Sequence, residues 1–351
     1  MTIIDILQKA VDEGASDVFI VAGLGLSFRK NGVIILEEDT RLMPPDTEKL
    51  VREIYELADN RDISHVLKKG DDDFALAVPH LSRFRVSAYK QRGSLSAVIR
   101  VISFRMPDPE AFSIPKTIID LGNQAKGMVL VTGPAGSGKS TTLACIIDAI
   151  NRNRASHIIT LEDPIEYLHR HVRSIVSQRE IDVDTESYVT ALRAALRQSP
   201  DVILLGEMRD YETISVAMTA AETGHLLFST LHTIGAASTI NRIMDVFPAE
   251  QQHQISVQLS SVLSAVVSQQ LLPTKDGTVV PAFEILIVTP AIRNMIREKK
   301  VYQIDGFIQS SGGTMISMDT SIMNLYREGK ITKETAIGFA SNPEMLSKRL
   351  M

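Results

Sequence analysis

The chain has 351 residues, of which 44% are hydrophobic and 23% are charged, and its formal net charge is -5. These values are typical of a globular protein with about two domains. A negative net charge argues against binding to nucleic acid through bulk positive charge. The single cysteine, Cys145, excludes an internal disulfide and a four-cysteine zinc site, and it suits a reducing cytoplasm.

Residues 1–105 mix short helical and extended patterns, and we expect them to form a small α+β domain. Apolar residues recur at helical spacing over residues 3–11, and again over residues 50–58 after the break at Pro44 and Pro45. Apolar runs suited to strands cover residues 17–22, 84–89 and 95–102.

Residues 106–116 contain Pro107, Pro109 and Pro115, which disfavour both helix and strand, so we expect a linker. Over residues 117–351 we expect one domain in which strands and helices alternate. Its strand-like runs cover residues 128–132, 157–161, 202–205 and 226–228. This alternation predicts a mostly parallel sheet that binds its ligand at the carboxyl ends of the strands.

Residues 251–274 contain no Asp, Glu, Lys or Arg. Scattered Gln and Ser argue against a transmembrane segment, and we expect a soluble protein. The apolar residues of this stretch are spaced as on one face of a helix, which predicts a helix here. From Pro290 onward we expect mainly helices.

The strongest motif is the segment Gly133-Pro-Ala-Gly-Ser-Gly-Lys-Ser140, which fits G-x-x-x-x-G-K-[ST] between a strand-like run and a helical pattern. Its glycines let successive backbone N–H groups face phosphate oxygens at a helix N-terminus. We expect Lys139 to reach the β- and γ-phosphates of ATP and Ser140 to bind Mg²⁺. The predicted nucleotide-binding residues are Gly133, Pro134, Ala135, Gly136, Ser137, Gly138, Lys139, Ser140 and Thr141.

Two acidic segments follow neighbouring strand-like runs. Glu207 comes just after residues 202–205 and is the candidate to hold Mg²⁺ together with Ser140. The other segment, residues 160–166, offers Glu162 and Glu166, either of which could orient or deprotonate the attacking water. The residues themselves do not decide between these two glutamates.

Two histidines, His225 and His232, flank a short apolar run. Two histidines without further ligands do not make a zinc site, and an ordinary core or surface role is the common alternative. A strand end that faces the γ-phosphate is the sharper hypothesis, because a polar side chain there can sense whether this phosphate is present.

Together these segments resemble the secretion ATPase superfamily of type II and type IV pilus systems. The motifs are a Walker A segment (133–140), an Asp box (160–166), an atypical Walker B segment (200–210) and a His box (223–233). The resemblance implies a small PAS-like α+β domain before a RecA-like P-loop core, with C-terminal helices. It also implies that Glu166 is the catalytic carboxylate and Glu207 the Walker B acid.

The resemblance extends to residues that act between subunits. The family works as hexamers, in which the N-terminal domain of one subunit faces the ATP of the next. His225 and His232 match the two His-box histidines, and Arg85 and Arg100 match the arginines that can offset charge on the transferred phosphate.

Within the superfamily, residues 290–298 and the opening at residues 14–20 resemble PilT-type retraction ATPases, although Phe19 stands where this branch has His. The branch implies a homohexamer at the inner face of the cytoplasmic membrane, with a pilus platform protein and a PilU-like paralogue as partners. The alternatives are a PilU-like accessory protein, a pilus-extension or type II secretion ATPase, and a nucleic-acid translocase. Extension and secretion members usually carry a four-cysteine module that this chain lacks.

Overall fold

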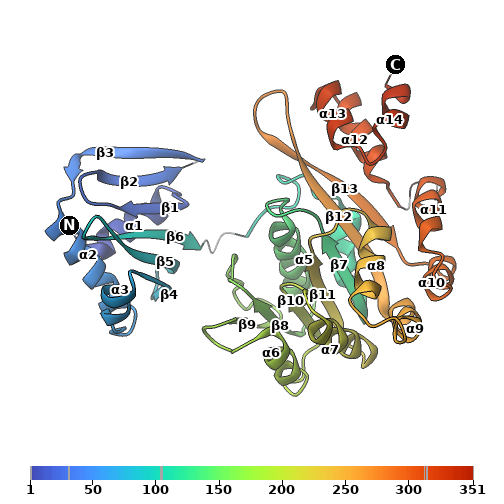
Figure 1. Cartoon of the computed structure of the whole chain (residues 1–351), viewed down its shortest axis with the longest axis horizontal. Helices are drawn as coiled ribbons and strands as arrows, with labels where there is room; N and C mark the ends of the chain where they lie inside the picture. Colours follow the sequence, from blue (N-terminus) through green and yellow to red (C-terminus); the bar gives the residue numbers. More distant parts are fainter. Residues whose placement is uncertain (1, 31, 103–105, 312, 314, 351) are drawn as a thin grey trace. The chain divides into compact units, whose positions relative to one another are not determined.

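The structure is a computed structural model that describes residues 2–30, 32–102, 106–311, 313 and 315–350. The chain divides into two compact units, the first formed mainly by residues 1–105 and the second mainly by the residues that follow in the sequence (Figure 1). The short segment Ile165–Leu168 groups with the first unit. None of the helices in the described part of the chain combines the length and the apolar character needed to cross a membrane.

The first unit is a six-stranded antiparallel sheet with three helices. The helices are α1 (Ile3–Asp12), α2 (Pro44–Leu57) and α3 (Ser64–Lys69). The strands are β1 (Asp17–Ile20), β2 (Gly25–Lys30), β3 (Val33–Arg41), β4 (Asp71–Val78), β5 (Ser82–Gln91) and β6 (Ser94–Ile102). Their order in the sheet is β3-β2-β1-β6-β5-β4, and every neighbouring pair is antiparallel.

The helical stripes predicted in this unit form its core. Helix α1 begins with a capping box between Thr2 and Asp5 and buries Ile3, Ile6 and Leu7, which lie three and four residues apart. These side chains share one hydrophobic core with α2 and with the inward face of the sheet. The expected α+β class is confirmed, although β2, β3 and β4 were not predicted.

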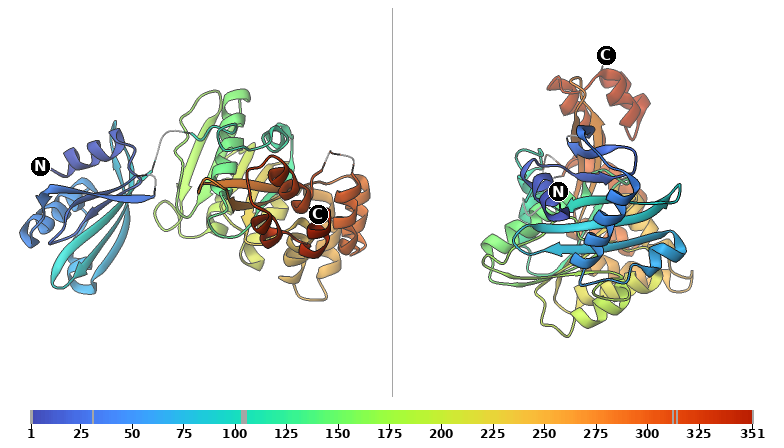
Figure 2. Two further views of the ribbon diagram at one scale, coloured as in Figure 1. Left: turned by 90° about the horizontal axis from the view of Figure 1, so that it is seen from above. Right: turned by 90° about the vertical axis from the view of Figure 1, so that its left-hand side faces the viewer.

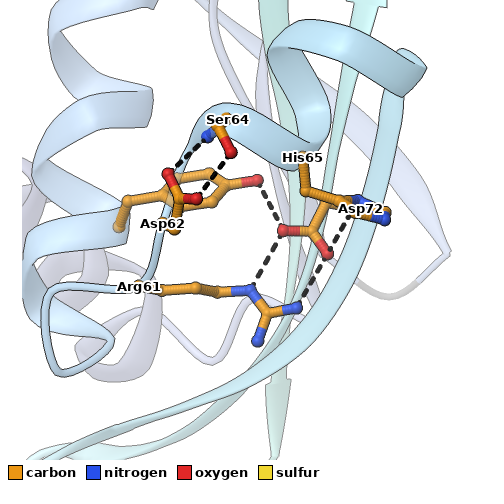
Figure 3. A network of polar contacts seen from close by, with 6 residues as sticks. Arg61, Asp62, Ser64, His65 and Asp72 are labelled. Atoms are coloured by element: carbon orange, nitrogen blue, oxygen red, sulfur yellow. Dashed lines mark hydrogen bonds and ion pairs between the residues drawn. The ribbon is translucent and has the colours of Figure 1, made fainter.

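A buried carboxylate connects two elements of the first unit (Figure 3). Asp72, at the start of β4, accepts hydrogen bonds from the Tyr55 hydroxyl at 2.9 Å and from Arg61 Nε and Nη2 at 3.0 and 2.9 Å. Burial alone would raise the pKa of Asp72, but the hydrogen bonds from Arg61 and Tyr55 outweigh it and hold this pKa below its usual range. Asp72 is therefore held as a carboxylate in the folded unit.

The second unit has a seven-stranded sheet in the order β13-β12-β7-β11-β10-β8-β9, whose pairs are parallel except β12 with β13. The strands are β7 (Gly127–Thr132), β8 (His157–Glu162), β9 (Ile175–Glu180), β10 (Val202–Leu205), β11 (Leu226–Leu231), β12 (Leu263–Pro273) and β13 (Val279–Ile287). The expected mostly parallel core is confirmed.

Helices cover both faces of this sheet. On one face lie α4 (Lys116–Ile119) and α5 (Lys139–Asn153), whose apolar residues join one core. The other core takes residues from α6 (Tyr188–Ala195), α7 (Tyr211–Glu222), α8 (Ala236–Asp245), α9 (Gln252–Val262), α10 (Pro290–Arg297) and α11 (Ile304–Ser310). Helices α12 (Met318–Arg327), α13 (Lys333–Phe339) and α14 (Pro343–Arg349) pack with the far end of the β12–β13 hairpin (Figure 2).

The helix predicted over residues 251–274 is correct only in its first half. Helix α9 ends at Val262, and the chain continues as β12 from Leu263. In β12, Val266 packs into one core and Val267 into the other, so both faces are buried. A strand buried on both faces is a continuous apolar run, which matches helical spacing as well as extended spacing.

Candidate active site

The glycine-rich loop follows β7 and leads directly into α5. The strand ends at Thr132, and the helix begins at Lys139. Gly133, Gly136 and Gly138 have φ angles of 142°, 75° and 86°, a region that L side chains rarely adopt. A turn of this kind in front of a helix N-terminus presents backbone N–H groups to an anion.

Gln269 of β12 packs closely against two glycines of the loop. A Cβ added to Gly133 would lie 2.1 Å from the Gln269 carbonyl oxygen, and one added to Gly138 would lie 2.9 Å from Gln269 Nε2. The same side chain accepts a 2.7 Å hydrogen bond from Thr142 Oγ1 in the first turn of α5. Gly133 is thus required by contact with the backbone as well as by conformation, whereas Gly138 is required chiefly by its conformation. Sequence reasoning missed Gln269, which no motif marks.

Lys139 lies over the loop that precedes it. Its Nζ donates hydrogen bonds to the carbonyl oxygens of Gly133 and Pro134, both at 2.9 Å. Ser137, within the loop, is buried, and its Oγ has no hydrogen-bond partner in the described structure. A buried hydroxyl of this kind, in a turn that leaves no room for a side chain at Gly133, fits a bound phosphate group.

The strand order brings Glu162, Glu207 and His232 to the same edge of the sheet as the loop. Strands β7, β11, β10 and β8 are consecutive and parallel, so their carboxyl ends meet at one edge. The glycine-rich loop follows β7, His232 follows β11, Glu207 follows β10, and Glu162 ends β8. This is the edge where α/β sheets bind their ligands, and we call it the phosphate edge because the glycine-rich loop lies on it.

Glu207 is the centre of the contacts at this edge and is 9% exposed. One carboxylate oxygen lies 2.5 Å from Arg209 Nη2, and the other lies 3.3 Å from His232 Nε2. The backbone around it is fixed to β11, because Thr230 Oγ1 donates to the Gly206 carbonyl at 2.6 Å and Met208 N donates to the Thr230 carbonyl at 3.1 Å. Glu207 therefore connects the ends of β10 and β11.

The two glutamates of the Asp box lie in different surroundings. Glu162 Oε1 accepts hydrogen bonds from Thr160 Oγ1 at 2.6 Å and from Gln178 Nε2 at 3.2 Å. Glu166 is exposed and lies in the short segment that groups with the first unit. Glu162 thus contacts β9 through Gln178, whereas the Glu166 side chain is exposed.

Tyr188, the first residue of α6, is a further polar residue that the sequence analysis did not single out. Its hydroxyl would lie 2.6 Å from a Cβ added to Gly206, so Gly206 leaves it room beside Glu207. Burial, and then the negative charges of Asp163, Glu207 and Glu162, raise the pKa of Tyr188. The Tyr188 hydroxyl therefore stays un-ionised near Asp163, Glu162 and Glu207.

His225 and His232 lie at opposite ends of β11. Leu226 pairs with Gly127 at the start of β7, and Leu231 pairs with Thr132 at its end. His225 Nδ1 lies 2.9 Å from the Ala220 carbonyl at the end of α7. The expected position at the phosphate edge thus holds for His232 and not for His225, because a parallel strand separates its two ends by about 3.3 Å per residue.

Arg85 and Arg100 are directly opposite each other on β5 and β6 of the first unit. Arg100 Nε donates to Asp17 Oδ1 at 3.2 Å, and Arg29 Nε lies 3.5 Å from Asp17 Oδ2. The Arg29 guanidinium also lies 5.5 Å from the centre of the Phe19 ring. Phe19 thus takes part in a cation–π contact beside this cluster.

A cavity of 280 Å³ opens beside the loop in the second unit. Its lining combines residues 111–114, the start of α5 and the hairpin: Ala111, Phe112, Ser113, Ile114, Gly138, Thr141, Thr142, Gln269, Leu271, Val279, Val280 and Pro281. Phe112 is 50% exposed, so an aromatic face is open next to the loop. Such a mainly apolar cavity next to a phosphate site suits a flat nucleotide base.

The residues present also suit a magnesium ion that arrives with a nucleotide. Among the described residues, no group of three His, Cys, Asp or Glu side chains is placed to hold a metal ion by itself. Mg²⁺ needs no such group, because it keeps several waters and takes oxygens from substrate phosphates. The Ser140 hydroxyl at the start of α5 and the Glu207 carboxylate are the oxygen ligands that would hold this ion.

A glycine-rich loop with its lysine, an acid after a neighbouring strand and a mostly parallel sheet define the class of this protein as a P-loop ATPase. The family model described as "Type II/IV secretion system protein" matches residues 1–316, and the chain belongs to this family.

Two relatives and one solved structure extend the comparison over the whole chain. The type IV pilus retraction ATPase PilT of Pseudomonas aeruginosa is 42% identical over 345 residues, covering 98% of this chain and 99% of the relative. The type IV pilus ATPase PilU of the same organism is 38% identical over 348 residues, covering 99% and 90%. The crystal structure of the pilus retraction motor PilT with bound ADP superposes with a TM-score of 0.90 and 43% identity, covering 99% of both chains.

Proposed function

We propose that this chain hydrolyses ATP to power the retraction of type IV pili. The observation that carries the proposal is the single sheet edge that holds the glycine-rich loop, Lys139, Glu207 and His232. The direction of the work, retraction, is supported by the similarity to PilT over nearly the full length of both chains.

In this proposal the phosphates of ATP lie on the loop amides, and Lys139 exchanges its bonds to Gly133 and Pro134 for phosphate oxygens. Ser140 and Glu207 would hold Mg²⁺, which would supply positive charge that offsets the charge of the phosphates. The adenine base occupies the cavity next to Phe112. Because Glu207 contacts both Arg209 and His232, filling the site would redistribute these contacts, and loss of the γ-phosphate would restore them.

Glu166 is the proposed carboxylate that orients the attacking water. Glu162 already accepts two hydrogen bonds, from Thr160 and Gln178, which commits its side chain to holding β8 and β9 together. Of the two glutamates in this segment, Glu166 is the one whose side chain is exposed to solvent. Its role follows from the family resemblance, and the mutational comparison below tests it.

The experiment compares Glu166→Gln with Glu162→Gln in the purified full-length protein. Glu166→Gln should keep ATP affinity while turnover falls by a factor of at least about 10², the scale of general-base catalysis. Glu162→Gln should change turnover less than tenfold and lower the melting temperature. The reverse pattern would assign the catalytic role to Glu162, and normal turnover in both variants would remove both residues from catalysis.

The assembly is part of the same proposal. We infer a homohexamer in which Arg85 and Arg100 of one subunit offset phosphate charge at the site of the next, docked on an inner-membrane platform protein from the cytoplasmic side. Mass measurement of the intact complex tests the hexamer. Arg100→Ala tests the arginine, since it should lower turnover per subunit while the ring stays assembled.

A second candidate is favoured by one observation, the 38% identity to PilU over 99% of this chain. An accessory ATPase of this kind would act beside a separate retraction motor. Deletion of the gene discriminates the two, because loss of the motor should leave excess surface pili and abolish twitching. A strain that still retracts its pili would support the accessory role, and a strain without pili would point to an extension motor.

A further inference from the structure

A buried carboxylate joins the N-termini of two helices far from each other in the sequence. Glu284 lies on β13 and is 7% exposed. Its Oε1 accepts a 2.8 Å hydrogen bond from Ala236 N, and its Oε2 accepts a 3.3 Å hydrogen bond from Met318 N. Ala236 is the first residue of α8 and Met318 is the first residue of α12. One side chain therefore serves two helix N-termini, whose first N–H groups have no partner within the helix.

The neighbouring strand completes this arrangement. Ser268 of β12 pairs directly with Glu284 across the hairpin. Ser268 Oγ accepts a 2.9 Å hydrogen bond from Gly235 N, the residue before Ala236. Two facing residues of one hairpin thus hold two consecutive backbone amides at the start of α8.

The amides held in this way come directly after the phosphate edge. Only Thr233 and Ile234 separate Gly235 from His232, which contacts Glu207. Thr233 Oγ1 lies 2.7 Å from Thr239 Oγ1, and Thr239 Oγ1 donates to the Gly235 carbonyl at 2.7 Å. These two contacts tie the loop that follows His232 to the first turn of α8.

The second helix belongs to a different part of the unit. Met318 packs in a small core of its own, formed by α12, α13 and α14 with the end of the hairpin. Helix α12 is not in the core that contains α8. In the described structure, Glu284 is the residue that hydrogen-bonds to both helices through its two oxygens.

We propose that Glu284 is a positioning residue that transmits the state of the nucleotide site to the C-terminal helices. On this view, the contact of His232 with Glu207 sets the position of α8, and the shared carboxylate passes a change in that position to α12 and so to α13 and α14. The inference rests on the proposed ATP site and adds an output element to it: the C-terminal helices respond to nucleotide through one residue.

The test is hydrogen–deuterium exchange of the full-length protein with and without a non-hydrolysable ATP analogue. In the unaltered chain, the analogue should change exchange at the starts of both α8 and α12 by at least threefold. In Glu284→Gln, which keeps the size of the side chain but replaces one acceptor oxygen with a donor, the response at α8 should persist and the response at α12 should be lost.

Asp319→Asn is the matched control. Asp319 also accepts two backbone N–H groups, from Ser341 at 2.6 Å and Asn342 at 3.1 Å, but all three residues belong to the C-terminal helices and their connection. This variant should loosen residues 341–342 and keep the nucleotide response at the start of α12. If Glu284 had only a structural role, both variants would show faster hydrogen–deuterium exchange that is equal with and without the analogue.

The outcomes separate the inference from the proposed function. An unchanged response at α12 in Glu284→Gln, or no response at α12 in an unaltered chain that binds the analogue, would overturn the inference alone. An unaltered chain that binds no analogue would overturn the inference and the proposed function together. If Glu284→Gln does not fold, Ser268→Ala serves instead: it should weaken the response at both helices, and a full response at α12 would again refute the proposal.

Discussion

Thr142 donates a 2.7 Å hydrogen bond to the side chain of Gln269, 127 residues later in the chain. This contact ties the helix that follows the glycine-rich loop to β12. Because the Gln269 backbone also closes the space beside Gly133, one residue supports the loop at two points. The shape of the nucleotide site thus depends on a strand that carries none of its sequence motifs.

Gln269→Ala should therefore weaken ATP binding without removing any residue that contacts phosphate. Loss of the hydrogen bond leaves the buried Thr142 hydroxyl without its partner, at a cost of about 1–3 kcal/mol. If part of this free energy destabilises the loop, the affinity for ATP should drop roughly tenfold. Titration with a fluorescent ATP analogue measures it. Gln270→Ala, the neighbouring buried glutamine, is the control and should leave affinity within about twofold.

Gly133→Ala should abolish nucleotide binding. Its φ of 142° disfavours any side chain, and the new Cβ would lie 2.1 Å from a backbone oxygen that cannot rotate away. Gly136→Ala is the comparison, because Gly136 has a φ of 75° and nothing within 4 Å of an added Cβ. It should cost about 1 kcal/mol of backbone strain and keep weakened binding. Equal affinity in the two variants would contradict the contact with Gln269.

His232→Ala and His225→Ala should have different effects. His232 contacts Glu207 at the phosphate edge, so its loss should reduce ATP turnover at least tenfold with little change in melting temperature. His225 contacts the end of α7 at the opposite edge, so its loss should lower the melting temperature and spare turnover per folded molecule. Steady-state ATPase assays and thermal denaturation on the same samples distinguish the two effects.

Asp72→Asn should destabilise the first unit and change its response to acid. The pKa of Asp72 is held low in the folded state, so its contribution to stability is complete above the unfolded pKa of about 3.9 and is lost as pH falls through the folded value. At neutral pH the substitution should cost about 1–3 kcal/mol, because Arg61 and Tyr55 lose an ionised partner.

The measurement for Asp72 is calorimetric unfolding of the full chain between pH 3 and pH 7, a range that brackets the usual carboxyl pKa. The unaltered chain should lose stability in the acid part of this range, and Asp72→Asn should show a flatter dependence. Asp71→Asn is the neighbouring control, since Asp71 is exposed. A control that matched Asp72→Asn would show that the acid sensitivity has another source.

Local patterns predicted much of this structure. The glycine-rich loop, the strand before it, the acid after β10 and the alternation of strands and helices all follow from short segments whose chemistry is carried by neighbouring residues. These predictions needed no knowledge of which strands are adjacent. The α+β class of the first unit followed in the same way from the stripes of α1 and α2.

The remaining features depend on contacts between distant segments. The separation of His225 from His232 follows from the direction of β11, and the roles of Gln269, Tyr188 and Glu284 follow from sheet order and hairpin register. Edge strand β3 was missed because its apolar residues Val33, Ile34, Ile35 and Leu36 are all exposed, so they do not alternate with polar residues as a half-buried strand does.

The two units have separate hydrophobic cores, which affects how amino-acid substitutions can accumulate in this protein. Every residue of the first unit's core precedes position 100, and every residue of the other cores follows position 113, within the part of the chain that the structure describes. Each unit can accordingly accumulate apolar substitutions without repacking the interior of the other. Exchange of whole units between paralogues should preserve both interiors, which makes chimaeras a practical way to ask which half carries the choice of partner.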